Sequence, residues 1–246
     1  MRTELDAEAL LTLWEGALGQ PASARDEALL RVSFEGAEPP MRTLGERNVT
    51  LIELHACLFG REIELLSHCP ACGTAAQFSG DCAVLAAQMR PKLDVAPPHR
   101  LEACGHQIEF RLPDGADIAI ASSDDNGEDF AQLLLDRCVL ACTHEGNEVP
   151  VRQLPEPVLG ALSRHMESLD PGASVSFALE CPRCARRWQA PLDVGEMLWQ
   201  KVRAAAERVL LDIDALARSY GWTEREVLGL SPLRRAAYLQ MATAGG

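Results

Sequence analysis

The sequence predicts an α+β protein, mainly helical, built around a split zinc ribbon with an inserted subdomain and a C-terminal helical arm. Two Cys-x-x-Cys motifs, at residues 69–72 and 181–184, are each flanked by short segments typical of strands. Helical periodicity dominates the first third of the chain, and a proline-free amphipathic stretch follows the second motif. Together these patterns indicate two strand-knuckle-strand hairpins set among helices.

The N-terminal region, residues 1–60, reads as helical. Apolar residues recur at helical spacing over 5–18, and Ser23 is a plausible N-cap for a second helix through residue 32. A loop is expected at 36–40. A third helix should span 44–59, with Gly60 as its C-terminal stop.

The first half of the ribbon is expected at residues 61–82, with strands over 62–68 and 75–78. The second half is expected at 173–192, where strands over 173–180 and 187–190 enclose the second motif. This is an internal repeat of the form strand, knuckle, strand.

Between the two halves lies the insert, residues 83–172. We expect a hairpin of 100–104 and 107–112, an acidic loop at 122–129, and helices over 130–142 and 155–169.

The arm, residues 193–246, begins with a long helix over 194–220 that Gly221 ends. Thr223 and Glu226 form a capping box, and Ser231-Pro232 starts a last helix with proline at its first position.

The cysteine motifs predict one shared metal site. A structural zinc ion takes four ligands in a tetrahedron, and a single Cys-x-x-Cys turn supplies two of them. Proline follows the first cysteine of each motif and rigidifies the turn, and Gly73 permits a positive φ after the first motif. Each motif is therefore half of a site for one structural zinc ion. The expected ligands are Cys69, Cys72, Cys181 and Cys184.

Other readings of the nine cysteines stay open. One Cys-x-x-Cys pair alone would fit a thiol oxidoreductase. Cys57 is expected to be a buried small hydrophobe, and Cys82 could compete as a ligand of the first motif. Cys138 and Cys142, on one face of the expected helix, could bind a second metal. Cys104 and His106, at the expected turn, could act as a ligand or a nucleophile.

Charge and motifs argue against several functions. The net charge of −13 disfavours a broad nucleic-acid-binding surface, although residues 186–240 are mildly basic, with nine Lys or Arg and seven Asp or Glu. Four thiolates leave no coordination position for water, and we find no phosphate loop, His-Glu-x-x-His or Gly-x-Ser-x-Gly motif. We therefore expect neither an enzyme nor a small-molecule substrate.

The sequence also predicts no membrane association. No run of about 18 uncharged apolar residues is present, and the first residues lack the layout of a signal peptide. We expect a cytoplasmic location.

Several segments carry a resemblance to a known family. They are 25–30 (RDEALL), 58–60 (LFG), 69–73 (CPACG), 110–113 (FRLP), 133–140 (LLLDRCVL), 181–184 (CPRC), 197–199 (MLW), 216–228 (LARSYGWTEREVL) and 230–239 (LSPLRRAAYL). With them, and most specifically near its C-terminus, the chain resembles the T-even-phage-type baseplate protein family. Ala185 departs from the glycine that usual ribbons carry at that point.

Members of that family occur in contractile-tailed phages and in related bacterial contractile injection systems. The resemblance implies a part in building the baseplate or its central hub, as an assembly factor or as a retained component. Its partners would be other baseplate or hub proteins. The alternative function is a regulatory, nucleic-acid-binding zinc ribbon.

Aromatic and arginine side chains near the C-terminus are candidates for partner binding, since such residues dominate interface hot spots. An ordinary role in the core or on an exposed helix is the other reading of each. The candidates are Trp199, Trp222, Arg234, Arg235 and Tyr238.

Overall fold

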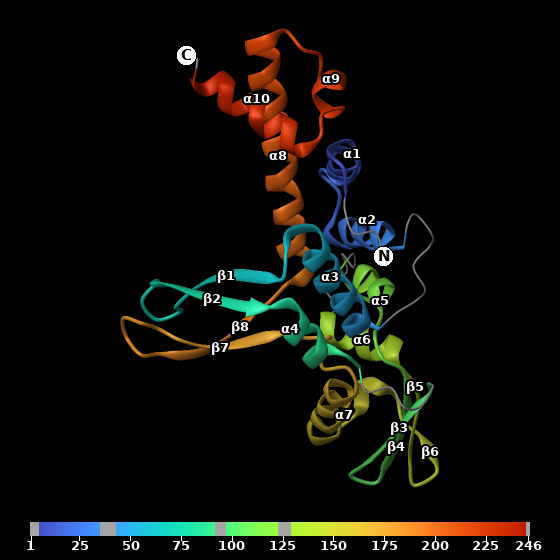
Figure 1. Ribbon diagram of the computed structural model, residues 1–246. Coiled ribbons are helices and arrows are strands. Elements are labelled where there is room, and N and C mark those ends of the chain that lie inside the picture. The colour runs from blue at the N-terminus through green and yellow to red at the C-terminus, as the bar shows by residue number, and fades with distance from the viewer. Residues whose placement is uncertain (1–4, 35–42, 92–96, 123–128, 245–246) are drawn as a thin grey trace.

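The computed structural model describes residues 5–34, 43–91, 97–122 and 129–244, and Figure 1 shows how their helices and strands are arranged. The fold is α+β and mainly helical, with small antiparallel sheets, as the sequence predicts. Within the described residues, no helix combines the length and the apolar character that crossing a bilayer requires.

The central helix of the body is α3 (Leu44–Phe59). It begins with a capping box, in which the Thr43 hydroxyl accepts from the Glu46 N–H and the Glu46 carboxylate accepts from the Thr43 N–H. It ends at Gly60, whose φ of +95° glycine adopts without strain. Helices α2 (Ala22–Ser33), α4 (Cys82–Met89) and α8 (Val194–Tyr220) pack against it, and α1 (Ala7–Ala17) packs against α2 and α8.

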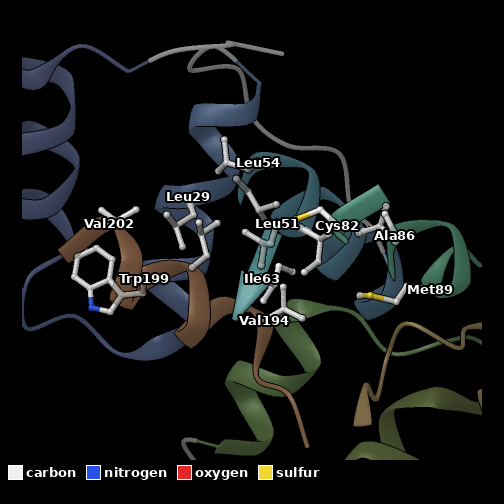
Figure 2. Packing of buried hydrophobic residues seen from close by; sticks show 14 of the residues in the cluster. Leu29, Leu51, Leu54, Ile63, Cys82, Ala86, Met89, Val194, Trp199 and Val202 are labelled. Atoms are coloured by element: carbon white, nitrogen blue, oxygen red, sulfur yellow. The ribbon is translucent and has the colours of Figure 1, made fainter. Parts of the chain in front are cut away.

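The main core forms where α3 meets the first turns of α8, and Figure 2 shows its packing. Leu51 and Leu54 of α3 are fully buried. The other labelled members of this cluster are Leu29, Ile63, Cys82, Ala86, Met89, Val194, Trp199 and Val202. The N-terminal region and the beginning of the arm therefore share one core.

Two hairpins extend from this body side by side, with their turns at the far end (Figure 1). Strands β1 (Glu62–His68) and β2 (Ala75–Asp81) form the first, and β7 (Ser176–Glu180) and β8 (Arg187–Pro191) the second. In each strand, exposed residues alternate with less exposed ones, so each sheet has one inner and one outer face.

The insert has its own sheet, in the order β3-β4-β5-β6, and its own core around Ile108, Phe110 and Leu162. The strands are β3 (His99–Ala103), β4 (His106–Phe110), β5 (Val139–His144) and β6 (Asn147–Glu148). The helices are α5 (Gly115–Ser122), α6 (Phe130–Cys138), η1 (Val151–Gln153) and α7 (Glu156–Leu169).

Helix α8 continues past the core and carries the rest of the arm (Figure 1). Gly221, with φ of +70°, ends it, and Thr223 and Glu226 form the expected capping box. The last two helices are α9 (Glu224–Leu228) and α10 (Pro232–Ala244).

Some expectations about elements are wrong. The expected helix 130–142 ends at Cys138, because residues from Val139 onward pair with β4 as strand β5. Pro21, not Ser23, is the N-cap of α2. Helices α4 and α5 lie where we expected none. The loop at 36–40 and most of the acidic loop fall outside the described residues.

Two buried carboxylates join distant parts of the chain at helix N-termini. The Asp170 carboxylate accepts the Gly45 N–H at 2.9 Å, which fixes the end of the insert to α3. A Cβ at Gly45 would lie 1.7 Å from Asp170 Oδ1, and one at Gly195 would lie 2.0 Å from Asp26 Oδ1. Glycine in the first turn of α3 and of α8 thus allows a carboxylate to approach the positive end of the helix.

Asp26 is the more strongly perturbed of the two acids. The residue is 8% exposed, and burial raises the pKa of its carboxyl to about 6 even though Arg47 Nη1, 3.1 Å away, opposes the shift. The folded chain therefore holds this proton more tightly than the unfolded chain does. Its contribution to stability is fully present below the unfolded pKa and is lost as pH rises through about 6.

Replacing Asp26 with asparagine should remove that pH dependence. We expect the free energy of unfolding of Asp26→Asn, relative to the parent, to rise by about 2 kcal/mol between about pH 4 and pH 7. Urea unfolding of both proteins across this pH range measures the difference. The contributions of the other titrating groups cancel, because both proteins contain them. A difference that does not change with pH would contradict the assignment.

Candidate metal centre

The two cysteine motifs form turns of the same design. Each turn has six residues, with cysteines at its first and fourth positions, and joins the strands of one hairpin. In the first, the Gly73 N–H donates to the Cys69 carbonyl at 2.9 Å. In the second, the Ala185 N–H donates to the Cys181 carbonyl at 3.0 Å. The internal repeat in the sequence is therefore a repeat of backbone geometry.

The fifth position of each turn has left-handed backbone. Gly73 adopts φ of +71° and Ala185 adopts φ of +56°. Only glycine enters this region without steric cost, and an alanine there is strained by about 1–2 kcal/mol. The departure at Ala185 noted in the sequence therefore has a conformational cost but does not change the path of the turn.

The turns bring all four sulfurs together, and each close approach joins one hairpin to the other. Cys69 Sγ lies 3.7 Å from Cys184 Sγ, and Cys72 Sγ lies 3.5 Å from Cys181 Sγ. All four sulfurs lie within 4.8 Å of one another, and none forms a disulfide.

These distances suit a bound ion. A tetrahedral site with metal–sulfur bonds of about 2.3 Å has sulfur–sulfur edges of about 3.8 Å. The expected four-cysteine cluster is thus assembled with a size that accommodates one metal ion. It is the one cluster of at least three His, Cys, Asp or Glu ligands found in the part of the chain that the structure describes.

Inner-face side chains hold the hairpins together below the cluster. The Phe78 and Phe177 rings lie 4.5 Å apart between centroids, and the Trp188 indole N–H donates to Ser67 Oγ at 3.4 Å. These residues were not predicted. The sequence pattern that could have identified the aromatic residues is an apolar residue at every second position of β2, β7 and β8, since alternate side chains of a strand lie on one face.

Hydrogen bonds at the turns favour thiolate. Cys72 Sγ lies 3.3 Å from the Thr74 hydroxyl, and hydrogen bonds from the Thr74 side chain and backbone lower the pKa of Cys72 to about 6. The Arg183 N–H donates to Cys181 Sγ at 3.4 Å. The Arg186 N–H favours the thiolate of Cys184, but the three neighbouring cysteine thiols and burial together outweigh it and raise the pKa of Cys184 to about 12. Without a cation, the crowded sulfurs therefore cannot all ionise at neutral pH.

The remaining cysteines lie apart from this cluster. Cys82 belongs to the main core, 3.5 Å from His55 Nδ1, so the prediction that it could compete as a ligand is not supported. Cys138 ends α6 whereas Cys142 lies on β5, and the helical face that would have joined them does not exist. Burial raises the pKa of both. Cys57 is half-buried and Cys104 is exposed in the β3–β4 turn.

The candidates for partner binding divide into two groups. Trp199 is 4% exposed, with the Arg25 guanidinium over its ring, and Arg235 is 8% exposed. Both are covered by the chain itself, which favours the other reading of these two residues, an ordinary role in packing within the chain. Trp222 and Tyr238 are half-buried in an aromatic cluster with Tyr220, and Arg234 is exposed.

Comparison with protein-family models, curated proteins and solved structures found no match to this chain.

Loss of a single cysteine from the cluster should release the metal. We expect the parent protein to retain one metal ion per chain and Cys69→Ser or Cys181→Ser to lose affinity by more than about a hundredfold, since substitutions merely next to ligands cost about 10–100-fold. Cys57→Ser, outside the cluster, should retain the ion. Metal analysis after gel filtration measures this, and equal metal content in all variants would contradict the site.

Substitutions at the fifth position of the two turns should have opposite effects on the stability of the protein. Ala185→Gly removes strain and should stabilise the metal-bound protein by about 0.5–1 kcal/mol, whereas Gly73→Ala should destabilise it by about 1 kcal/mol. A Cβ at Gly73 would meet nothing within 4 Å, so its effect isolates backbone strain from crowding. Thermal unfolding measures both, and shifts of the same sign would refute this explanation.

Proposed function

We propose that this chain is a non-enzymatic, zinc-binding structural or assembly protein, chaperone-like in acting by protein–protein binding. The observation that carries the proposal is the convergence of Cys69 and Cys72 with Cys181 and Cys184 at the end of two packed hairpins. This convergence supports the proposal of a zinc ribbon whose two hairpins are separated in sequence by the insert.

Four cysteine thiolates as ligands favour zinc as the bound ion. Zinc accepts four thiolates in a tetrahedron without a preference for another geometry, and sites of this composition are structural because no position is left for water. Catalysis at the ion would require an open position. The proposed role of the ion is therefore to hold the two hairpins together.

Energetics support such a role. Bringing together turns separated by the 108 residues between Cys72 and Cys181 costs about 4 kcal/mol by the logarithmic loop rule. Structural zinc binding contributes about 10–16 kcal/mol at neutral pH. Metal binding is thus strong enough to fix the hairpins, and with them the points where the insert leaves the body and returns to it.

The biological setting that we propose is the baseplate, or its central hub, of a contractile phage tail or bacterial injection system. The support is the resemblance of the quoted segments, above all those in α8, α9 and α10. The protein would be made in the cytoplasm, and would either be incorporated into the particle or act only during assembly. Among the partner-binding candidates, Trp222, Arg234 and Tyr238 remain.

One observation favours the second candidate function, nucleic-acid binding. Arg183, Arg186 and Arg187 are exposed at the turn of the second hairpin. However, Arg187 is paired with Glu180, and four thiolates around a divalent ion leave a local charge of −2. The net charge of −13 adds long-range repulsion of phosphates, so protein binding is the better supported function.

Co-purification tests the two functions together. We expect the tagged, metal-loaded chain to retain baseplate or hub proteins encoded beside it, and Cys181→Ser to retain less of them than Cys57→Ser does, because the released hairpins lose their fixed geometry. In a gel-shift series at increasing salt, we expect no DNA binding. Failure to retain any of these proteins would count against the assembly role, and a salt-dependent shift of DNA would favour the alternative.

A further inference from the structure

The four cysteines at the turns of the projecting hairpins (Figure 1) differ in exposure. Cys69 and Cys181, at the first position of each turn, are 2% and 3% exposed. Cys72, at the fourth position of its turn, is half-buried, and Cys184, at the same position of the other turn, is exposed. Each hairpin therefore contributes one buried cysteine and one that solvent reaches.

The close sulfur–sulfur approaches each join a buried cysteine to an accessible one. Cys184 Sγ lies 3.7 Å from Cys69 Sγ, and Cys72 Sγ lies 3.5 Å from Cys181 Sγ. A reagent that reaches the accessible sulfur of one hairpin thus finds a close partner for it in the other hairpin. Because a disulfide bond is about 2.05 Å long, each sulfur has to move by less than about 1 Å to form one.

We propose that oxidation by a hydroperoxide replaces the metal link between the two hairpins with a covalent one, a disulfide that joins Cys69 to Cys184 or Cys72 to Cys181. The inference rests on the proposed function, in which one ion binds all four sulfurs. It adds that the hairpins stay joined when the ion leaves.

The reaction consumes one molecule of hydrogen peroxide for each disulfide. The accessible thiolate attacks one peroxide oxygen, the O–O bond breaks, and the other oxygen leaves as hydroxide. The buried thiolate of the other hairpin then attacks the resulting sulfenic acid, which forms the S–S bond and expels the second oxygen as hydroxide. Two protons convert the two hydroxides into water. The sulfurs have lost two electrons, so the site keeps two thiolates and loses its affinity for the ion.

Access decides which sulfur reacts first. Metal ligands are already deprotonated, so none of the four cysteines has to lose a proton before it attacks the peroxide. Cys184 is exposed and Cys72 is half-buried, whereas Cys69 and Cys181 are almost fully covered. The first two are therefore the attacking cysteines, and the buried two complete the disulfides.

Contacts below the cluster keep the two hairpins adjacent while the link is exchanged. The Phe78 and Phe177 rings lie 4.5 Å apart between centroids, and the Trp188 indole N–H donates to Ser67 Oγ. None of these contacts involves a cysteine, so they do not depend on the state of the sulfurs. The partner in the other hairpin thus stays within reach of the sulfur that has reacted.

Stepwise addition of hydrogen peroxide to the metal-loaded full chain tests the proposal. Released metal is followed with a chromogenic chelator, and disulfides are identified by mass spectrometry of tryptic peptides after the remaining thiols are alkylated. Trypsin cleaves after Arg183 and so separates Cys181 from Cys184. We expect disulfides between the hairpins to exceed disulfides within a motif by at least tenfold, and metal release to follow their formation.

The matched control is Cys104→Ser. Of the nine cysteines, only Cys104 and Cys184 are exposed, and Cys104 lies outside the cluster in the β3–β4 turn. Its loss should change neither the disulfides between the hairpins nor the release of metal. In the parent, Cys104 also reports the peroxide concentration at which an exposed thiol of this chain reacts.

Three outcomes would overturn the proposal and leave the metal site intact. They are disulfides confined to Cys69–Cys72 or Cys181–Cys184, release of metal with no disulfide formed, and a cluster that stays reduced where Cys104 is oxidised. A chain that holds no metal before peroxide is added would instead refute the proposed function, on which the inference rests.

Hydrogen exchange compares the disulfide with simple loss of the ion. One sample is the peroxide-treated full chain, and the other is the full chain stripped by a chelator under reducing conditions. We expect amides of β1, β2, β7 and β8 to exchange at least tenfold more slowly in the oxidised sample, since two-stranded hairpins are marginally stable unless joined to other structure. Equal exchange rates would show that the disulfide does not replace the ion and would overturn the proposal.

Discussion

The meeting of two short cysteine turns is the constraint on which the arrangement of this chain depends. The turns are far apart in sequence, yet each sulfur of one turn lies close to a sulfur of the other. Cys69 Sγ lies beside Cys184 Sγ, and Cys72 Sγ lies beside Cys181 Sγ. The insert, which connects the two hairpins, must therefore leave the body beside the first hairpin and return beside the second. Two hydrogen bonds to α3 complete this return, one from the Gly45 N–H to Asp170 and one from the Asn48 side chain to the Gly172 carbonyl.

Helix α8 connects the hairpins, the core and the arm. Its first turns follow β8 directly and enter the main core through Val194, Leu198 and Val202. Its last turns carry the aromatic cluster of Tyr220 with Trp222 and Tyr238. Displacement at one end would be transmitted along the helix, since a continuous helix without proline or interior glycine beyond its first turn resists bending.

The sequence predicts the elements correctly where the local signal and the fold agree. Strand β1 and helices α3 and α8 have the predicted bounds, because their periodicity and their ends at Gly60 and Gly221 specify the same structure. The cysteine spacing likewise predicts the four-cysteine cluster that the structure brings together. Local patterns of this kind need no knowledge of what packs against them.

Local sequence patterns do not predict structure that depends on a neighbour distant in the chain. Residues after Cys138 have apolar spacing compatible with a helix, but pairing with β4 makes them a strand. Trp199 and Arg235 have the residue types of binding hot spots, and only tertiary packing reveals that they are covered. Thr74 contributes to the site through a hydrogen bond to Cys72 that the Cys-x-x-Cys pattern does not encode.

The position of the cysteine cluster has a consequence for how order is distributed in the molecule. The helical body keeps a large apolar cluster of its own, whereas the hairpins share only a few inner-face contacts such as Phe78 with Phe177. Two-stranded hairpins are marginally stable by themselves in water. Loss of the proposed metal ion would therefore loosen the projecting hairpins, and with them the entry and exit of the insert, before it affected the helical body.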